Sequence, residues 1–126
     1  MESTEKKFTE PKKFDYNIVA IGAGAGGLVT SYIAAAVNAK VALIEKSKMG
    51  GDCLNYGCVP SKALIKSAKI VHSATKAKKF GLKSISVDFD FAEVMQRVQR
   101  VIKTIEPHDS VERYTELGVD LSLIHI

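Results

Sequence analysis

The chain has 126 residues, of which 46% are hydrophobic and 25% are charged, and its formal net charge is +4. This ordinary globular composition argues against a wholly disordered chain, and the longest apolar stretch, 28–37, is too short to cross a membrane. The lysines of 62–79 lack the interleaved arginines and aromatic residues of a nucleic-acid site, so we predict no nucleic-acid partner.

The chain begins with a polar and charged segment, residues 1–13, which we expect to be a mobile tail. This segment contains no apolar region of the kind that a secretory signal needs, which predicts a cytoplasmic protein. The next segment, 15–21 ("DYNIVAI"), is short, apolar and rich in β-branched residues. It predicts a strand that is buried on both faces, as in a parallel sheet.

A glycine-rich turn, "GAGAGG", follows this strand, and Gly22, Gly24 and Gly27 match the spacing G-x-G-x-x-G. An uncharged segment, 28–39, predicts a helix, and a second strand precedes Glu45. This order of elements predicts a Rossmann-like α/β fold that binds a dinucleotide, either NAD or FAD. The three glycines would permit the turn, the approach of a pyrophosphate and close packing of the helix.

Two residues at the end of the second strand complete the predicted dinucleotide site. Glu45 lies eighteen residues after Gly27 and can accept hydrogen bonds from the adenosine ribose. We also expect the neighbouring Lys46 to contribute to cofactor binding.

Both cysteines of the chain lie in the segment 51–62, "GDCLNYGCVPSK". Two cysteines without a matching histidine pair are too few for a structural zinc site, so we predict no metal site. Inert burial is a second alternative, but the neighbouring residues are mostly glycine and polar. A reversible dithiol fits better, because Gly57 and Pro60 can distort the chain enough to bring Cys53 and Cys58 together.

The second half of the chain is predicted to be mainly helical. A long helix covers 62–79, and a second helix begins at Asp90, with Glu93 completing a capping box, and ends before Pro107. A short helix then ends at Gly118, after which the chain enters a strand.

The stretch 50–65, "GGDCLNYGCVPSKALI", closely resembles the redox-active segment of the flavoprotein disulfide reductases. These class I pyridine nucleotide-disulfide oxidoreductases include dihydrolipoamide dehydrogenase, glutathione reductase and mercuric reductase. Together with the glycine motif upstream, the resemblance covers 14–120. It implies an incomplete FAD-binding domain, the N-terminal part of a Rossmann-like fold.

The resemblance also implies a role for each residue of the segment. Cys53 would meet the substrate and be the more exposed thiol, whereas Cys58 would lie against the flavin. Lys62 would sit near the flavin N5 and stabilise negative charge on the reduced ring. Gly50 and Gly51 would let the backbone pass close to the FAD pyrophosphate.

For the intact protein, the resemblance implies a homodimeric enzyme that passes electrons between NAD(P)H, FAD and the dithiol. The substrate would be a disulfide, a dithiol or a metal ion, and NAD(P)H would bind to a domain absent from this chain. We therefore expect the chain alone to be inactive. Two alternatives stay open, a dinucleotide-binding module without thiol chemistry and a two-cysteine redox sensor without turnover.

The last six residues, 121–126 ("LSLIHI"), do not resemble the family. They match one reading frame of a transposon end that is common in sequencing libraries. We therefore interpret them as a non-native tail, although their apolar residues are compatible with a strand.

Overall fold

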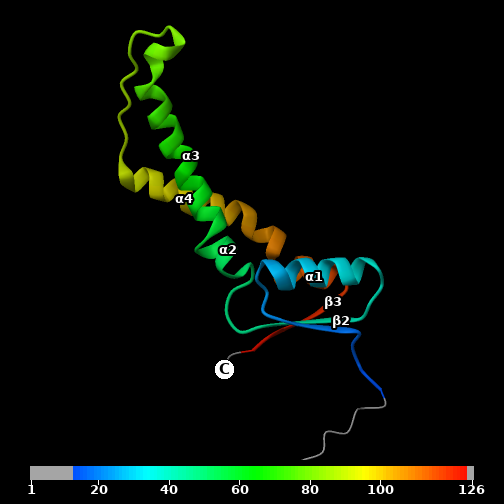
Figure 1. Cartoon of the computed structure of the whole chain (residues 1–126). Helices are drawn as coiled ribbons and strands as arrows, with labels where there is room; N and C mark the ends of the chain where they lie inside the picture. Colours follow the sequence, from blue (N-terminus) through cyan, green and yellow to red (C-terminus); the bar gives the residue numbers. More distant parts are fainter. Residues whose placement is uncertain (1–12, 125–126) are drawn as a thin grey trace, which may run out of the picture.

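The computed structural model describes residues 13–124, so the expected N-terminal tail lies outside the described residues except for Lys13. Three parallel strands form one sheet in the order β1-β2-β3. The strands are β1 (Ile18–Ile21), β2 (Val41–Glu45) and β3 (Val119–Leu123). Helix α1 (Ala25–Ala36) connects β1 to β2 and lies against the sheet (Figure 1). The α/β, Rossmann-like arrangement predicted from the sequence is confirmed.

The central strand β2 forms the middle of the core because it has a partner on each side. Val41 pairs with Ile18 of β1 and with Val119 of β3, and both valines are buried. Leu43 is completely buried and belongs to the same hydrophobic cluster as Leu28 of α1. The described part of β3 includes residues 121–123, and the non-native origin of 121–126 stays a prediction.

Strand β1 corrects one expectation from the sequence. It was predicted to be buried on both faces, but Val19 is 52% exposed and Ile21 is 86% exposed. Within the described residues β1 is an edge strand, since it pairs only with β2. The apolar side chains of α1 are exposed as well, at Val29 and Ile33.

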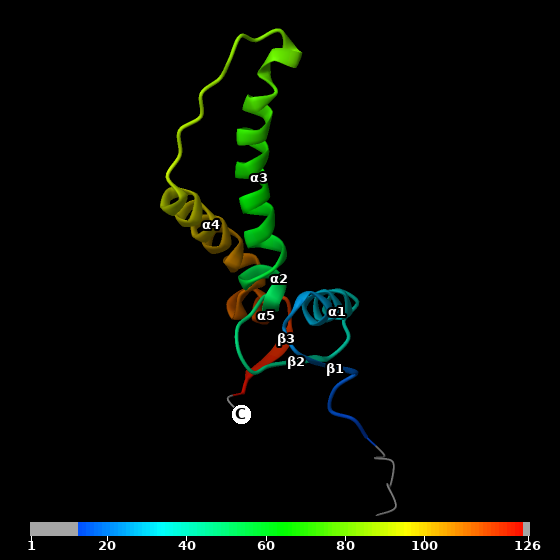
Figure 2. The same ribbon diagram turned by 60° about the vertical axis from the view of Figure 1, so that its left-hand side comes forward.

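Between β2 and β3 the chain forms a helical arm. Its elements are α2 (Gly51–Asn55), α3 (Cys58–Thr75), the 3-10 turn η1 (Ala77–Phe80), α4 (Phe91–Ile105), the 3-10 turn η2 (Glu106–Asp109) and α5 (Val111–Glu116). Helix α3 extends away from the sheet, and α4 leads the chain back toward it (Figure 2). No helix within residues 13–124 is long and apolar enough to span a membrane.

Local signals explain where these helices begin and end. Asp90 caps α4 as predicted, because its side chain accepts a hydrogen bond of 2.7 Å from the backbone N–H of Ala92. The hydrogen bonds found among the described residues do not include the second bond of the capping box, from Glu93. Gly118 follows α5 with a φ of +86°, as expected for a residue that ends a helix.

Candidate functional site

The glycine-rich turn between β1 and α1 needs glycine for steric reasons. Gly22 has a φ of +100°, which is a left-handed conformation. A Cβ atom at Gly27 would overlap the carbonyl oxygen of Gly22, whereas a Cβ at Gly24 would meet no atom within 4 Å. No side chain among the described residues caps the start of α1, and Ala25 and Gly26 in its first turn are exposed. The N–H groups of such a helix start suit a phosphate.

Glu45 lies at the end of β2 beside this turn and is only 7% exposed. One carboxylate oxygen accepts the backbone N–H of Ala23 at 2.5 Å, and the other accepts that of Ser47 at 2.7 Å. The carboxylate therefore connects the turn to the loop after β2. Each oxygen retains a further lone pair, which leaves acceptor capacity for a ribose hydroxyl.

Two consecutive glycines at the start of α2 lie in the left-handed region, Gly50 just before the helix at φ +82° and Gly51 as its first residue at φ +53°. A Cβ at Gly51 would lie 2.7 Å from the Cα of Gly24. The start of the two-cysteine segment therefore rests directly on the glycine-rich turn, and two separate sequence motifs form one site.

The two cysteines occupy adjacent helices and are both free thiols. Cys53 lies in α2 and Cys58 is the first residue of α3. A hydrogen bond with Cys58 raises the pKa of the Cys53 thiol above its usual value, and the nearby charge of Lys62 acts in the opposite direction. Between the helices, a Cβ at Gly57 would lie 2.9 Å from the carbonyl oxygen of Asp52, so this turn also favours glycine.

The exposure of the two thiols is the reverse of what we expected. Cys53 was predicted to be the more exposed, but it is half-buried and Cys58 is exposed. Cys53 lies in the short helix that packs between the glycine-rich turn and α3, while Cys58 lies at the exposed start of α3.

The remaining predicted residues take less specific positions. Lys62 is exposed on α3 near the two thiols, and Lys46 is exposed in the loop after Glu45. Residues 13–124 contain no group of three or more His, Cys, Asp or Glu side chains that could hold a metal ion.

Sequence reasoning missed the side chain of Asn55, which donates hydrogen bonds to the carbonyl oxygens of Met49 and Gly51. Its position between the two cysteines was the available signal. It also missed the bond between Glu45 and Ser47, for which the sequence offers no signal.

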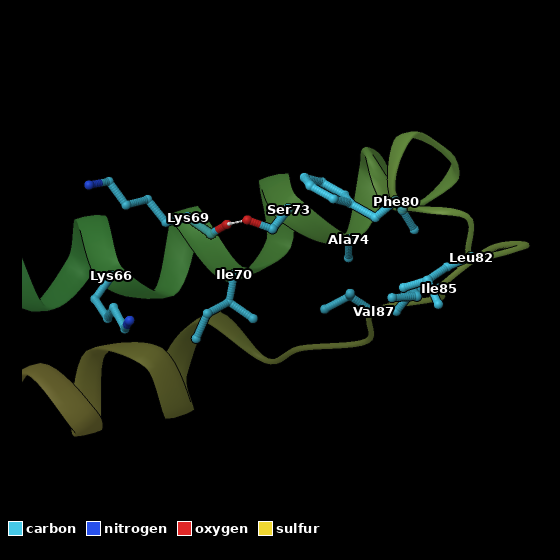
Figure 3. A pocket seen from close by; sticks show the side chains of 10 residues that line it. Lys66, Lys69, Ile70, Ser73, Ala74, Phe80, Leu82, Ile85 and Val87 are labelled. Atoms are coloured by element: carbon cyan, nitrogen blue, oxygen red, sulfur yellow. Dashed lines mark hydrogen bonds between the residues drawn. The ribbon is translucent and has the colours of Figure 1, made fainter.

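The large apolar grooves lie away from this site. One groove, of about 630 Å³, lies between the outer half of α3 and the loop after η1 (Figure 3). The view shows Ile70 and Ala74 of α3 on one side of the groove and Val87 of the loop on the other. No residue of the predicted cofactor or dithiol site lines this groove.

A family model described as pyridine nucleotide-disulphide oxidoreductase matches residues 16–119. The chain belongs to this family. The matched residues include every predicted site residue, from the glycine-rich turn to Lys62. Members of the pyridine nucleotide-disulphide oxidoreductase family use FAD and NAD(P)H.

Several relatives in this family are dihydrolipoyl dehydrogenases. The protein from Bacillus subtilis is 43% identical over 88 residues, which cover 70% of this chain and 19% of the relative. The protein from Zymomonas mobilis is 36% identical over 110 residues, which cover 82% of this chain and 24% of the relative. The chain thus spans about a fifth to a quarter of the length of these relatives.

Proposed function

We propose that the intact protein is an FAD-dependent, NAD(P)H-linked disulfide oxidoreductase whose redox-active pair is Cys53 and Cys58. The observation that carries the proposal is the contact between Gly51 and Gly24. Through this contact the dithiol segment lies on the turn where a dinucleotide would bind. Neither a plain nucleotide-binding module nor a redox sensor without cofactor needs the two motifs in contact.

The residues around the turn fit the FAD that we propose. The uncapped N–H groups at the start of α1 and the open space beside Gly24 suit the pyrophosphate. Glu45 is already oriented by two backbone donors and retains acceptor capacity for the ribose. When bound, FAD would supply two-electron transfer between NAD(P)H and the Cys53–Cys58 pair.

We assign the thiol chemistry of the pair from the resemblance of the segment to the redox-active segment of the family. In the reducing direction, the Cys53 thiolate attacks a substrate disulfide, forms a mixed disulfide and releases one thiol. The Cys58 thiolate then attacks the Cys53 sulfur, forms the Cys53–Cys58 disulfide and releases the second thiol. The reverse sequence oxidises a substrate dithiol. Lys62 would contribute a positive charge near the pair.

The name of the relatives supports a lipoyl dithiol or disulfide as the substrate in preference to a metal ion. We further propose that the intact protein is a cytoplasmic homodimer. The exposed apolar side chains of α3 and α4 are compatible with a partner surface.

The full-length protein tests this function by its absorption spectrum. We expect a yellow protein that is reduced by NADH or NADPH and that develops a long-wavelength band after uptake of two electrons. Because the band needs a thiolate beside the flavin, Cys58→Ser should abolish it, while Cys53→Ser should retain it. A colourless protein, or a band that persists in Cys58→Ser, would contradict the proposal.

The order of thiol alkylation provides a second test. Without FAD, we expect Cys58 to react first, because it is exposed and the pKa of Cys53 is raised. With FAD, we expect Cys53 to react first, because the flavin would cover Cys58. Peptide mass analysis after brief labelling of the reduced full-length protein measures both orders. An order that does not depend on FAD would remove Cys58 from the flavin site.

A further inference from the structure

The side-chain amide of Asn55 bridges two backbone carbonyl groups around the start of α2. Its Nδ2 atom donates to the carbonyl oxygen of Met49 at 3.0 Å and to that of Gly51 at 2.8 Å. Both partners are carbonyl oxygens, which can only accept, so the orientation of the amide is determined. Asn55 is half-buried at the end of α2, between the two cysteines of the segment.

Within the described residues, the only other side chain that hydrogen-bonds to the loop between β2 and α2 is Glu45, which accepts the N–H of Ser47. Gly50 and Gly51 are both left-handed, and the N–H of Gly51 donates to the carbonyl oxygen of Lys48 at 3.2 Å. Gly51 is also the residue that touches Gly24 of the glycine-rich turn. The two bonds from Asn55 therefore hold the backbone of residues 49–51. Through this backbone the start of α2 contacts the glycine-rich turn.

We propose that Asn55 is a positioning residue for the Cys53–Cys58 couple, an inference that rests on the proposed function. Cys53 is carried by α2, which has five residues and is too short to be stable by itself. The clamp from Asn55 places α2 against the turn and so sets the approach of Cys53 to Cys58. Without the clamp, the thiols spend less time within bonding distance, and the disulfide is less stable relative to the dithiol than in the wild-type protein.

The substitution Asn55→Asp tests the clamp with almost no change in shape. It replaces the donor nitrogen by a carboxylate oxygen, which faces the carbonyl oxygens of Met49 and Gly51. Asn17→Asp is the matched control, because the Oδ1 atom of Asn17 accepts the N–H of Lys40 at 2.8 Å and a carboxylate accepts equally well. The same chemical change should therefore have opposite outcomes at the two positions.

The measured quantity is the equilibrium of the couple in the full-length protein with glutathione. Oxidised glutathione and the Cys53 and Cys58 thiols give the protein disulfide and two molecules of reduced glutathione. We expect Asn55→Asp to lower this equilibrium constant about tenfold, which makes the reduction potential ~30 mV less negative for a two-electron couple. Asn17→Asp should leave the constant unchanged.

A folded Asn55→Asp variant with an unchanged constant would overturn the inference. Asn55→Ala removes the donors without adding a charge, and we expect a shift in the same direction. If both Asn55 variants are unfolded by circular dichroism while Asn17→Asp is folded, Asn55 has a structural role only, which also overturns the inference. If the wild-type protein forms no Cys53–Cys58 disulfide, the proposed function fails instead.

Discussion

Replacing Gly27 by alanine is expected to abolish FAD retention and to destabilise the fold by about 3 kcal/mol or more, the upper part of the usual cost of overpacking. The added Cβ would overlap the carbonyl oxygen of Gly22, a backbone atom that cannot rotate away. Either α1 separates from the turn or the turn itself changes shape. Flavin content after purification and thermal denaturation of the full-length protein measure the two effects.

The adjacent residue provides the control for this prediction. Gly26 lies in the same first turn of α1, but a Cβ there would meet no atom within 4 Å. Gly26→Ala should therefore retain FAD and stabilise the helix by about 0.5–1 kcal/mol, since alanine is the better helix former. Equal behaviour of the Gly26 and Gly27 variants would show that contact with Gly22 does not decide the packing of α1.

Replacing Glu45 by alanine is the second large effect that we expect. FAD affinity should fall by about 1–3 kcal/mol, the range for losing hydrogen bonds to a charged group. The structure adds a second consequence, because the N–H groups of Ala23 and Ser47 also lose their acceptor. The variant should therefore be less stable even without FAD. Equilibrium dialysis measures the affinity, and urea denaturation without FAD measures the stability.

Two further variants make the Glu45 prediction specific. Glu45→Gln keeps one acceptor oxygen, so its affinity for FAD should lie between those of wild type and Glu45→Ala. Glu93 on α4 is exposed, and Glu93→Ala should leave FAD binding unchanged. Full flavin occupancy of Glu45→Ala after dialysis would remove Glu45 from the cofactor site.

Features that depend on near neighbours in the chain could be predicted from the sequence. The glycine-rich turn, the helix after it and the cap at Asp90 each need only a few adjacent residues to be recognised. The prediction was less accurate for the end of α3, where a continuous helix to Lys79 was expected. The helix ends at Thr75, and a separate 3-10 turn follows it. The end lacks a strong local signal, since the nearest glycine is Gly81.

Features that depend on distant contacts could not be predicted in this way. The bond between Glu45 and the N–H of Ala23 joins residues 22 positions apart, so no local pattern reveals it. The burial of β1 depends on whether another strand pairs with its second edge. The apolar sequence of β1 does not reveal whether such a strand is present. The exposure of Cys58 depends in the same way on what covers it.

The hydrogen bond between the two long helices has a mechanical consequence for the dithiol. Arg97 of α4 donates from Nη1 to the carbonyl oxygen of Ala63 in α3 at 2.8 Å, and Ala63 is buried. This bond lies little more than one turn beyond Cys58, while the outer turns of α3 carry exposed side chains such as Ile70. We therefore expect the base of α3 to move less than its exposed outer turns. Hydrogen exchange of the full-length protein should then be slower around Ala63 than around Ile70, and the two thiols lie at the slower end of α3.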